Sequence, residues 1–70
     1  MMPLSMAKLG ETKLIKKIGG KEDLRQFLET LGFLPGTQVS VVTEIGGNII
    51  VKVKESRVAI SREMASKIMI

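Results

Sequence analysis

Apolar residues recur with the period of an α-helix in one segment of the chain, KEDLRQFLETLG (residues 21–32). Its apolar side chains occupy relative positions i, i+3, i+4 and i+7, which lie on one face of an α-helix. The first turn carries two acidic side chains, where the helix dipole favours negative charge. The pattern therefore predicts the only long helix of the chain, with a core face formed by Leu24, Phe27, Leu28 and Leu31.

This helix is expected to end at Gly32, because glycine readily adopts the left-handed conformation at the residue after a C-cap. Phe33 would then fold back onto Leu28, the apolar contact that often accompanies such a cap. Residues 34–37 (LPGT) have proline at the second position and glycine at the third, the pattern of a type II β-turn. The stretch is thus predicted to redirect the chain from the helix into a strand.

After the turn the apolar period changes from about 3.6 to 2, which indicates half-buried strands. Apolar and polar residues alternate in TQVSVVTE (residues 37–44) and again in NIIVKVK (residues 48–54). Two glycines between these segments, within Ile45–Asn48, predict a β-hairpin. In the first of the two strands, Val39 and Val41 are expected on one face and the polar side chains on the other, namely Gln38, Ser40 and Glu44.

The segment ETKLIKKI (residues 11–18) also alternates, although imperfectly, and predicts a strand before the helix. In such a strand Leu14 and Ile18 would share one face, and Ile15 would point to the other. Two glycines follow and separate this strand from the helix. The remaining expected elements are a turn at Glu55-Ser56, a strand at residues 57–60, a helical turn at residues 62–65 capped by Ser61, and a closing strand at residues 67–70.

Five short strands in a chain of 70 residues bury their apolar faces best by curling into a small barrel. We therefore expect a mainly β fold, a five-stranded barrel with the α-helix between strands 1 and 2 and a short helical turn before the last strand. The helix would plug an open end. A single domain would span residues 1–70, with residues 1–8 either loosely held or docked on the core through Pro3, Leu4 and Met6.

The amino-acid composition excludes several kinds of covalent cross-link and metal site. The chain contains no cysteine and no histidine, which excludes disulfides, thiolate zinc sites and imidazole ligands. No apolar run approaches the ~20 residues needed to span a bilayer, and the start of the chain lacks the pattern of a secretory signal. We expect a cytoplasmic protein. Its net charge of +4 is spread along the chain without a block of like charges.

The same inventory argues against an enzyme. Histidine, cysteine, tyrosine and tryptophan are absent, which removes the commonest general base and the thiol nucleophile. The glycines of GFLPG follow a helix C-terminus, whereas a phosphate cradle precedes a helix N-terminus, so no nucleotide site is expected there. Metal ligands would have to come from carboxylates, methionines and backbone carbonyls. We expect no cofactor, and the sequence identifies no metal-ligating residue.

The order and spacing of these motifs resemble the ferrous iron transport protein A family. The resemblance rests on L-x-x-L-G-F-L-P-G-x-x-V-x-V (Leu28–Val41), on VKVKESRVAISREMASKIMI at the end of the chain and on PLSMAKLGE at its start. It implies a small cytoplasmic SH3-like barrel without catalysis of its own, which accompanies an Fe(II) membrane transporter that carries a GTP-binding domain. One departure is the turn at Glu55-Ser56, where family members often carry a glycine.

The leading hypothesis is therefore a protein-interaction module, a monomer or weak oligomer that this transporter recruits to the inner face of the membrane without membrane insertion. One alternative is a metal-responsive regulatory domain like those of metal-dependent repressors, to which the family is related. The other is a basic barrel that binds nucleic acid, which the scarcity of aromatic residues for base stacking disfavours. The partner surface is expected to contain Phe33, Leu34, Pro35, Gly36, Ile50, Lys52, Lys54 and Arg57.

Overall fold

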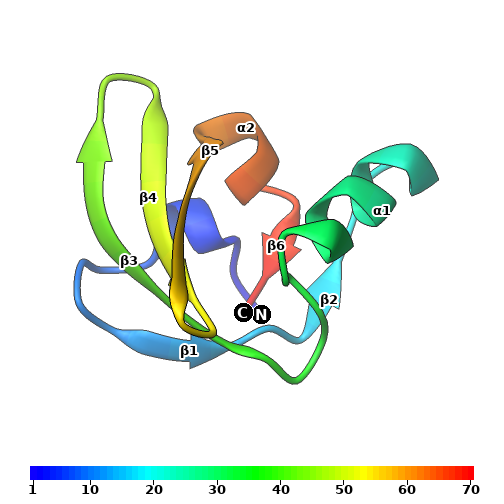
Figure 1. The fold of residues 1–70 in the computed structure, drawn as a ribbon, viewed down its shortest axis with the longest axis horizontal. Coiled ribbons are helices and arrows are strands. Elements are labelled where there is room, and N and C mark those ends of the chain that lie inside the picture. Colours follow the sequence, from blue (N-terminus) through cyan, green and yellow to red (C-terminus); the bar gives the residue numbers. More distant parts are fainter.

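The computed structural model describes residues 1–70 as six short β-strands, two α-helices and one 3-10 helix (Figure 1). The mainly β class and the single long helix are confirmed. In chain order the elements are η1 (Leu4–Met6), β1 (Thr12–Leu14), β2 (Lys17–Ile18), α1 (Glu22–Thr30), β3 (Gln38–Ile45), β4 (Asn48–Val53), β5 (Ser56–Ser61), α2 (Arg62–Ala65) and β6 (Ile68–Met69). None of the helices is long and apolar enough to cross a membrane.

The strands form two antiparallel sheets. The larger sheet has the order β1-β3-β4-β5, and the smaller one pairs β2 with β6. Figure 1 shows the larger sheet curving around the interior, with the smaller sheet and α1 on the opposite side. All buried residues are apolar and form one core: Leu4, Ile15, Ile18, Leu28, Phe33, Val39, Val41, Ile49, Val51, Val53, Ile60, Ala65, Ile68 and Ile70.

The strand expected at residues 11–18 is divided between the two sheets. The backbone N–H of Ile15 donates to the carbonyl oxygen of Thr37, whereas the next N–H, of Lys16, donates to Met69. Because the chain changes sheets here, simple alternation fails. Ile15 and Ile18 are both buried, while Leu14 is 51% exposed, so the prediction that Leu14 and Ile18 share a face is wrong.

Helix α1 contributes a narrower apolar stripe than its sequence predicts. Leu28 is fully buried, and Leu24 and Leu31 pack partly against the core, but Phe27 is 49% exposed. Adjacent helical residues differ by about 100° around the axis, so Phe27 lies on the flank when Leu28 faces inward. The expected core position of Phe27 is therefore wrong. The short helix α2 lies against β4 and β5 of the larger sheet.

The exit from α1 follows the prediction closely. The N–H of Phe33 donates to the carbonyl oxygen of Leu28 at 3.0 Å, and that of Gly32 donates to Glu29 at 2.9 Å. This pair of bonds is a Schellman motif, with Gly32 at φ +102° in the position that requires a left-handed residue. The following turn is closed by the N–H of Thr37, which donates to Leu34 at 3.0 Å. The predicted helix end and β-turn are confirmed.

A β-bulge interrupts the alternation of β3. Val41 pairs with Val51 and Thr43 pairs with Ile50, which leaves Val42 as the extra residue. Beyond the bulge the two faces exchange, so Glu44 lies opposite the buried Ile49 rather than on the outward face. The prediction that Glu44 shares a face with Gln38 and Ser40 is therefore wrong. Its carboxylate instead forms an ion pair with the guanidinium of Arg62 in α2.

The turn between β4 and β5 also differs from the expectation. Val53 pairs with Ser56, so the turn residues are Lys54 and Glu55, not Glu55 and Ser56. Lys54 has a φ of +56°, the only positive φ among residues other than glycine. A left-handed conformation costs a residue with a side chain about 1–2 kcal/mol. The turn position for which a glycine is best suited is therefore occupied by a lysine.

The two ends of the chain lie together, as Figure 1 shows. Met2 and Ile70 exchange two backbone hydrogen bonds of 2.9 and 2.8 Å. Leu4 in η1 is buried, so the segment before residue 9 is docked through this side chain.

Helix α2 is capped by Ser61, as predicted. The hydroxyl of Ser61 accepts a hydrogen bond from the N–H of Met64 at 3.1 Å.

Candidate functional site

A row of polar residues crosses the outward face of the larger sheet. Thr12 pairs with Ser40, Ser40 pairs with Lys52, and Lys52 pairs with Arg57, so one residue comes from each of the four strands. The face points to solvent because the residues on either side of Lys52, Val51 and Val53, are buried in the core. The antiparallel register thus brings together side chains that are distant in the sequence.

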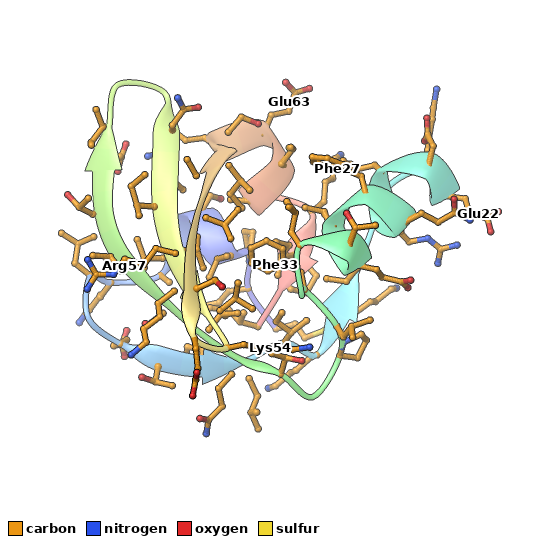
Figure 2. The ribbon with its side chains drawn as sticks, viewed as in Figure 1. Glu22, Phe27, Phe33, Lys54, Arg57 and Glu63 are labelled. Carbon is orange, nitrogen blue, oxygen red and sulfur yellow. The ribbon has the colours of Figure 1, made fainter.

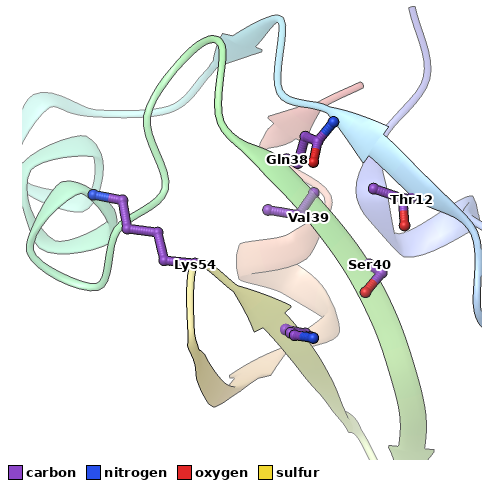
Figure 3. A pocket seen from close by; sticks show the side chains of 6 residues that line it. Thr12, Gln38, Val39, Ser40 and Lys54 are labelled. Carbon is purple, nitrogen blue, oxygen red and sulfur yellow. The ribbon is translucent and has the colours of Figure 1, made fainter.

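The row borders a shallow hollow of about 220 Å³ in the same face, shown in Figure 3. Ser40 and Lys52 line it together with Lys54, which extends from the turn after β4. Five of the six lining residues carry a hydroxyl, amide or ammonium group, and none of the side chains is a carboxylate. The lining residues are Thr12, Gln38, Val39, Ser40, Lys52 and Lys54.

Lys54 links this face to the exit from α1. Its Cδ and Cε atoms would lie 3.8 and 3.9 Å from a Cβ placed on Gly32, so its methylenes run alongside the Schellman motif. Figure 3 shows the side chain of Lys54 extending from the turn toward the end of α1. The last carbonyls of a helix attract positive charge, which favours this placement of the ammonium group.

The cations of this face have no acidic partner within the chain. The two ion pairs of the structure are Lys13 with Glu11 and Arg62 with Glu44. Three of the seven acidic residues lie in α1 and one lies in α2. Lys52, Lys54 and Arg57 are exposed and form no ion pair, and Glu55 in the turn after Lys54 is the one acidic residue between them in the sequence.

The structure divides the expected partner surface. Phe33 is 0% exposed and belongs to the core beneath the corner, as its position inside the molecule in Figure 2 shows, so it cannot contact a partner. Its assignment to the surface is wrong, because the Schellman motif turns this side chain inward. Ile50 is half-buried on the outward face, where it pairs with Ala59 of β5. The remaining expected residues are exposed: Leu34, Pro35, Gly36, Lys52, Lys54 and Arg57.

Four residues of the hollow were not expected at a site from the sequence, namely Val39 of the core and the polar residues Thr12, Gln38 and Ser40. Strand alternation placed Gln38 and Ser40 on a solvent face, but it could not show that this face also carries Lys52. That knowledge requires the pairing register of β3 with β4. A residue such as Thr12 carries no recognisable signal of its own, because isolated threonines are common in exposed strands.

A second, more apolar groove of about 310 Å³ lies beside the chain ends. Met1, Leu14 and Ile70 contribute apolar surface, and Lys13 and Lys16 contribute positive charge.

Nowhere does the structure bring together three or more histidine, cysteine, aspartate or glutamate side chains that could hold a metal ion.

Comparison with known proteins places this geometry among related chains. The family model of the FeoA domain matches residues 2–70. "Putative Fe(2+) transport protein A" of Methanocaldococcus jannaschii is 37% identical over 70 residues, which cover 100% of this chain and 85% of that protein. A crystal structure of the iron uptake regulatory protein FeoA superposes with a TM-score of 0.87 at 31% identity, and the match covers 96% of this chain and 89% of that chain.

The zinc-complexed crystal structure of FeoA from Stenotrophomonas maltophilia, which is described as a procaryotic SH3 domain protein, also shares the fold. It superposes with a TM-score of 0.86 at 23% identity, and the match covers 99% of this chain and 88% of that chain. The SH3-like barrel that the sequence resemblance implied is therefore confirmed.

Proposed function

The chain belongs to the FeoA domain family of ferrous iron transport accessory proteins, and from that premise we propose that it is a non-catalytic interaction module. Its partner is the cytoplasmic region of an Fe(II) membrane transporter that carries a GTP-binding domain. Binding recruits the protein to the inner face of the membrane and modulates transport. The family supplies the link to iron uptake, and the surface described above supplies the means of contact.

One observation carries the proposal: an exposed corner with an apolar residue adjoins a face of unpaired cations. Leu34 is 36% exposed at the corner after α1, where proline and glycine fix the turn. Lys54 connects this corner to the outward face of the sheet. Apolar contact within a charged rim is the usual anatomy of a protein interface.

Nucleic acid is the weaker candidate for the same surface. Proteins that bind single strands stack bases on exposed aromatic side chains, at ~1–3 kcal/mol per base. The chain has two aromatic residues, of which Phe33 is buried and Phe27 lies on α1. The charged face thus offers phosphate contacts without a stacking platform.

An NMR titration with the transporter's cytoplasmic region tests the proposal, with and without a guanine nucleotide. We expect amide shifts at Leu34, Gly36 and along β4. Leu34→Asp should weaken binding at least fivefold, because it places a charge in the apolar part of the contact. Ile45→Asp is the matched control, since Ile45 is 64% exposed at the tip of the hairpin. Absence of binding by the wild-type protein in both nucleotide states would refute direct contact.

A further inference from the structure

We infer that the hollow between β1, β3 and β4 is a carboxylate-binding site, and that the segment docking there is an extended acidic peptide. This inference rests on the proposed function, because it specifies the chemistry of the partner that the module would bind. It specifies where the partner binds, which is the hollow, which group of the partner binds there, which is a carboxylate, and how the acidic residues of the partner are spaced.

The donor set of the hollow favours a carboxylate. Lys52 provides an ammonium group, Thr12 and Ser40 provide hydroxyls, and the amide of Gln38 can donate as well, while Lys54 adds positive charge beside the hollow because its side chain extends toward α1. Neither lysine has an acidic partner within the chain. An anion entering the hollow would therefore gain charge-assisted hydrogen bonds without breaking an existing ion pair.

The size of the hollow limits what it can hold. Its volume of about 220 Å³ lies below the roughly 300–1,000 Å³ of pockets that enclose a nucleotide or another small molecule. The hollow also lies on the outward face of the sheet, where it opens to solvent. A single acidic side chain, presented by a chain that continues over the surface, fits these dimensions better than a free ligand.

The row on the sheet predicts the spacing of the acidic residues. From Thr12 to Arg57 it crosses three gaps between strands, or roughly 14 Å at about 4.8 Å per gap. An extended peptide presents alternate side chains on one face about 7 Å apart. Acidic residues at positions i, i+2 and i+4 would therefore follow the row from Thr12, at one side of the hollow, to Arg57.

The backbone of Lys54 gives independent support. Its φ of +56° is a conformation that glycine would adopt at lower cost, yet the turn holds a lysine whose side chain lines the hollow. Strained positions of this kind cluster at functional sites. The retained side chain is explained if its ammonium group contributes to binding.

Fluorescence anisotropy with a fluorescein-labelled peptide, Gly-Ser-Glu-Ser-Glu-Ser-Glu-Ser-Gly, tests the inference. The double variant Lys52→Gln/Lys54→Gln should bind about tenfold more weakly than wild type, because each charge removed should weaken binding roughly two- to fivefold. The control Lys21→Gln/Lys67→Gln removes the same charge from exposed lysines on either side of Gly20 and should change binding less than twofold. Higher salt should weaken wild-type binding.

Equal losses in the two double variants would overturn the inference, because they would show attraction to net charge alone. So would a peptide with three contiguous glutamates that binds as tightly, or a single-stranded oligonucleotide that binds more tightly. Repeating the transporter titration with both variants separates this inference from the proposed function. If the transporter region binds wild type and both variants equally, the proposed function stands and the carboxylate site is refuted.

Discussion

The N–H of Phe33 donates to the carbonyl oxygen of Leu28 at 3.0 Å, and both side chains are fully buried. The bond joins the last turn of α1 to the third residue beyond its end, and the two side chains enter the core together. The helix end is thereby fixed by tertiary packing as well as by its own cap. The corner that follows owes its position to this anchor.

We expect Phe33→Ala to destabilise the protein severely and Phe27→Ala to do so only slightly. Loss of the buried ring should lower the free energy of unfolding by about 3–5 kcal/mol, enough to unfold much of a small domain. Phe27 is 49% exposed, so its truncation should cost less than about 1 kcal/mol. Urea denaturation measures both variants, and similar losses would contradict the burial described here.

Gly36→Ala should cost about 1–2 kcal/mol through backbone conformation alone. The residue has a φ of +88°, and a Cβ atom placed on it would have no heavy atom within 4 Å. Gly47 has equal space around it but no positive φ, so Gly47→Ala should change stability by less than about 0.5 kcal/mol. Thermal unfolding of the two variants compares them directly; equal effects would exclude a conformational origin.

Lys54→Gly should stabilise the fold by about 0.5–1 kcal/mol, because glycine removes the cost of a left-handed lysine. The gain is partly offset by the greater freedom of glycine in the unfolded chain. Lys54→Ala keeps the backbone cost and removes the same side-chain charge, so it should leave stability nearly unchanged. Chemical denaturation should therefore rank the glycine variant above both alanine and wild type.

Ser61→Ala should lower the free energy of unfolding by about 1 kcal/mol, since the N–H of Met64 loses its acceptor. Aspartate is an equally good N-cap, so Ser61→Asp should retain wild-type stability. Circular dichroism during thermal unfolding tests the pair. A loss of stability with aspartate as large as with alanine would show that the hydroxyl acts other than as a cap.

Local signals in the sequence were sufficient for much of the fold. The change of apolar period located the helix and the central hairpin, and Gly32 with the following proline and glycine marked the corner. These features depend on a few neighbouring residues, so they can be inferred without knowledge of the whole structure. Residues 34–36 and the outward lysines of β4 were also placed correctly on the surface.

The failures share a physical cause, which is that the burial of a side chain depends on distant partners. Leu14 and Ile15 exchanged their expected roles because the chain passes between two sheets there. Phe27 and Phe33 also exchanged their expected burial, because the Schellman motif turns Phe33 inward and Phe27 lies on the flank of α1 when Leu28 faces the core. The hollow depends on strand register, so the contribution of Thr12 could not be foreseen.

The bulge at Val42 makes β3 sensitive to changes in chain length. Beyond it Glu44 faces Arg62, and the hairpin tip accepts a hydrogen bond from the N–H of Arg62 through the carbonyl oxygen of Gly47 at 3.0 Å. Deleting one residue here would restore strict alternation and turn Glu44 away from α2. Among natural relatives, insertions and deletions in this hairpin should therefore gather at its tip, where the phase of the strands is unaffected.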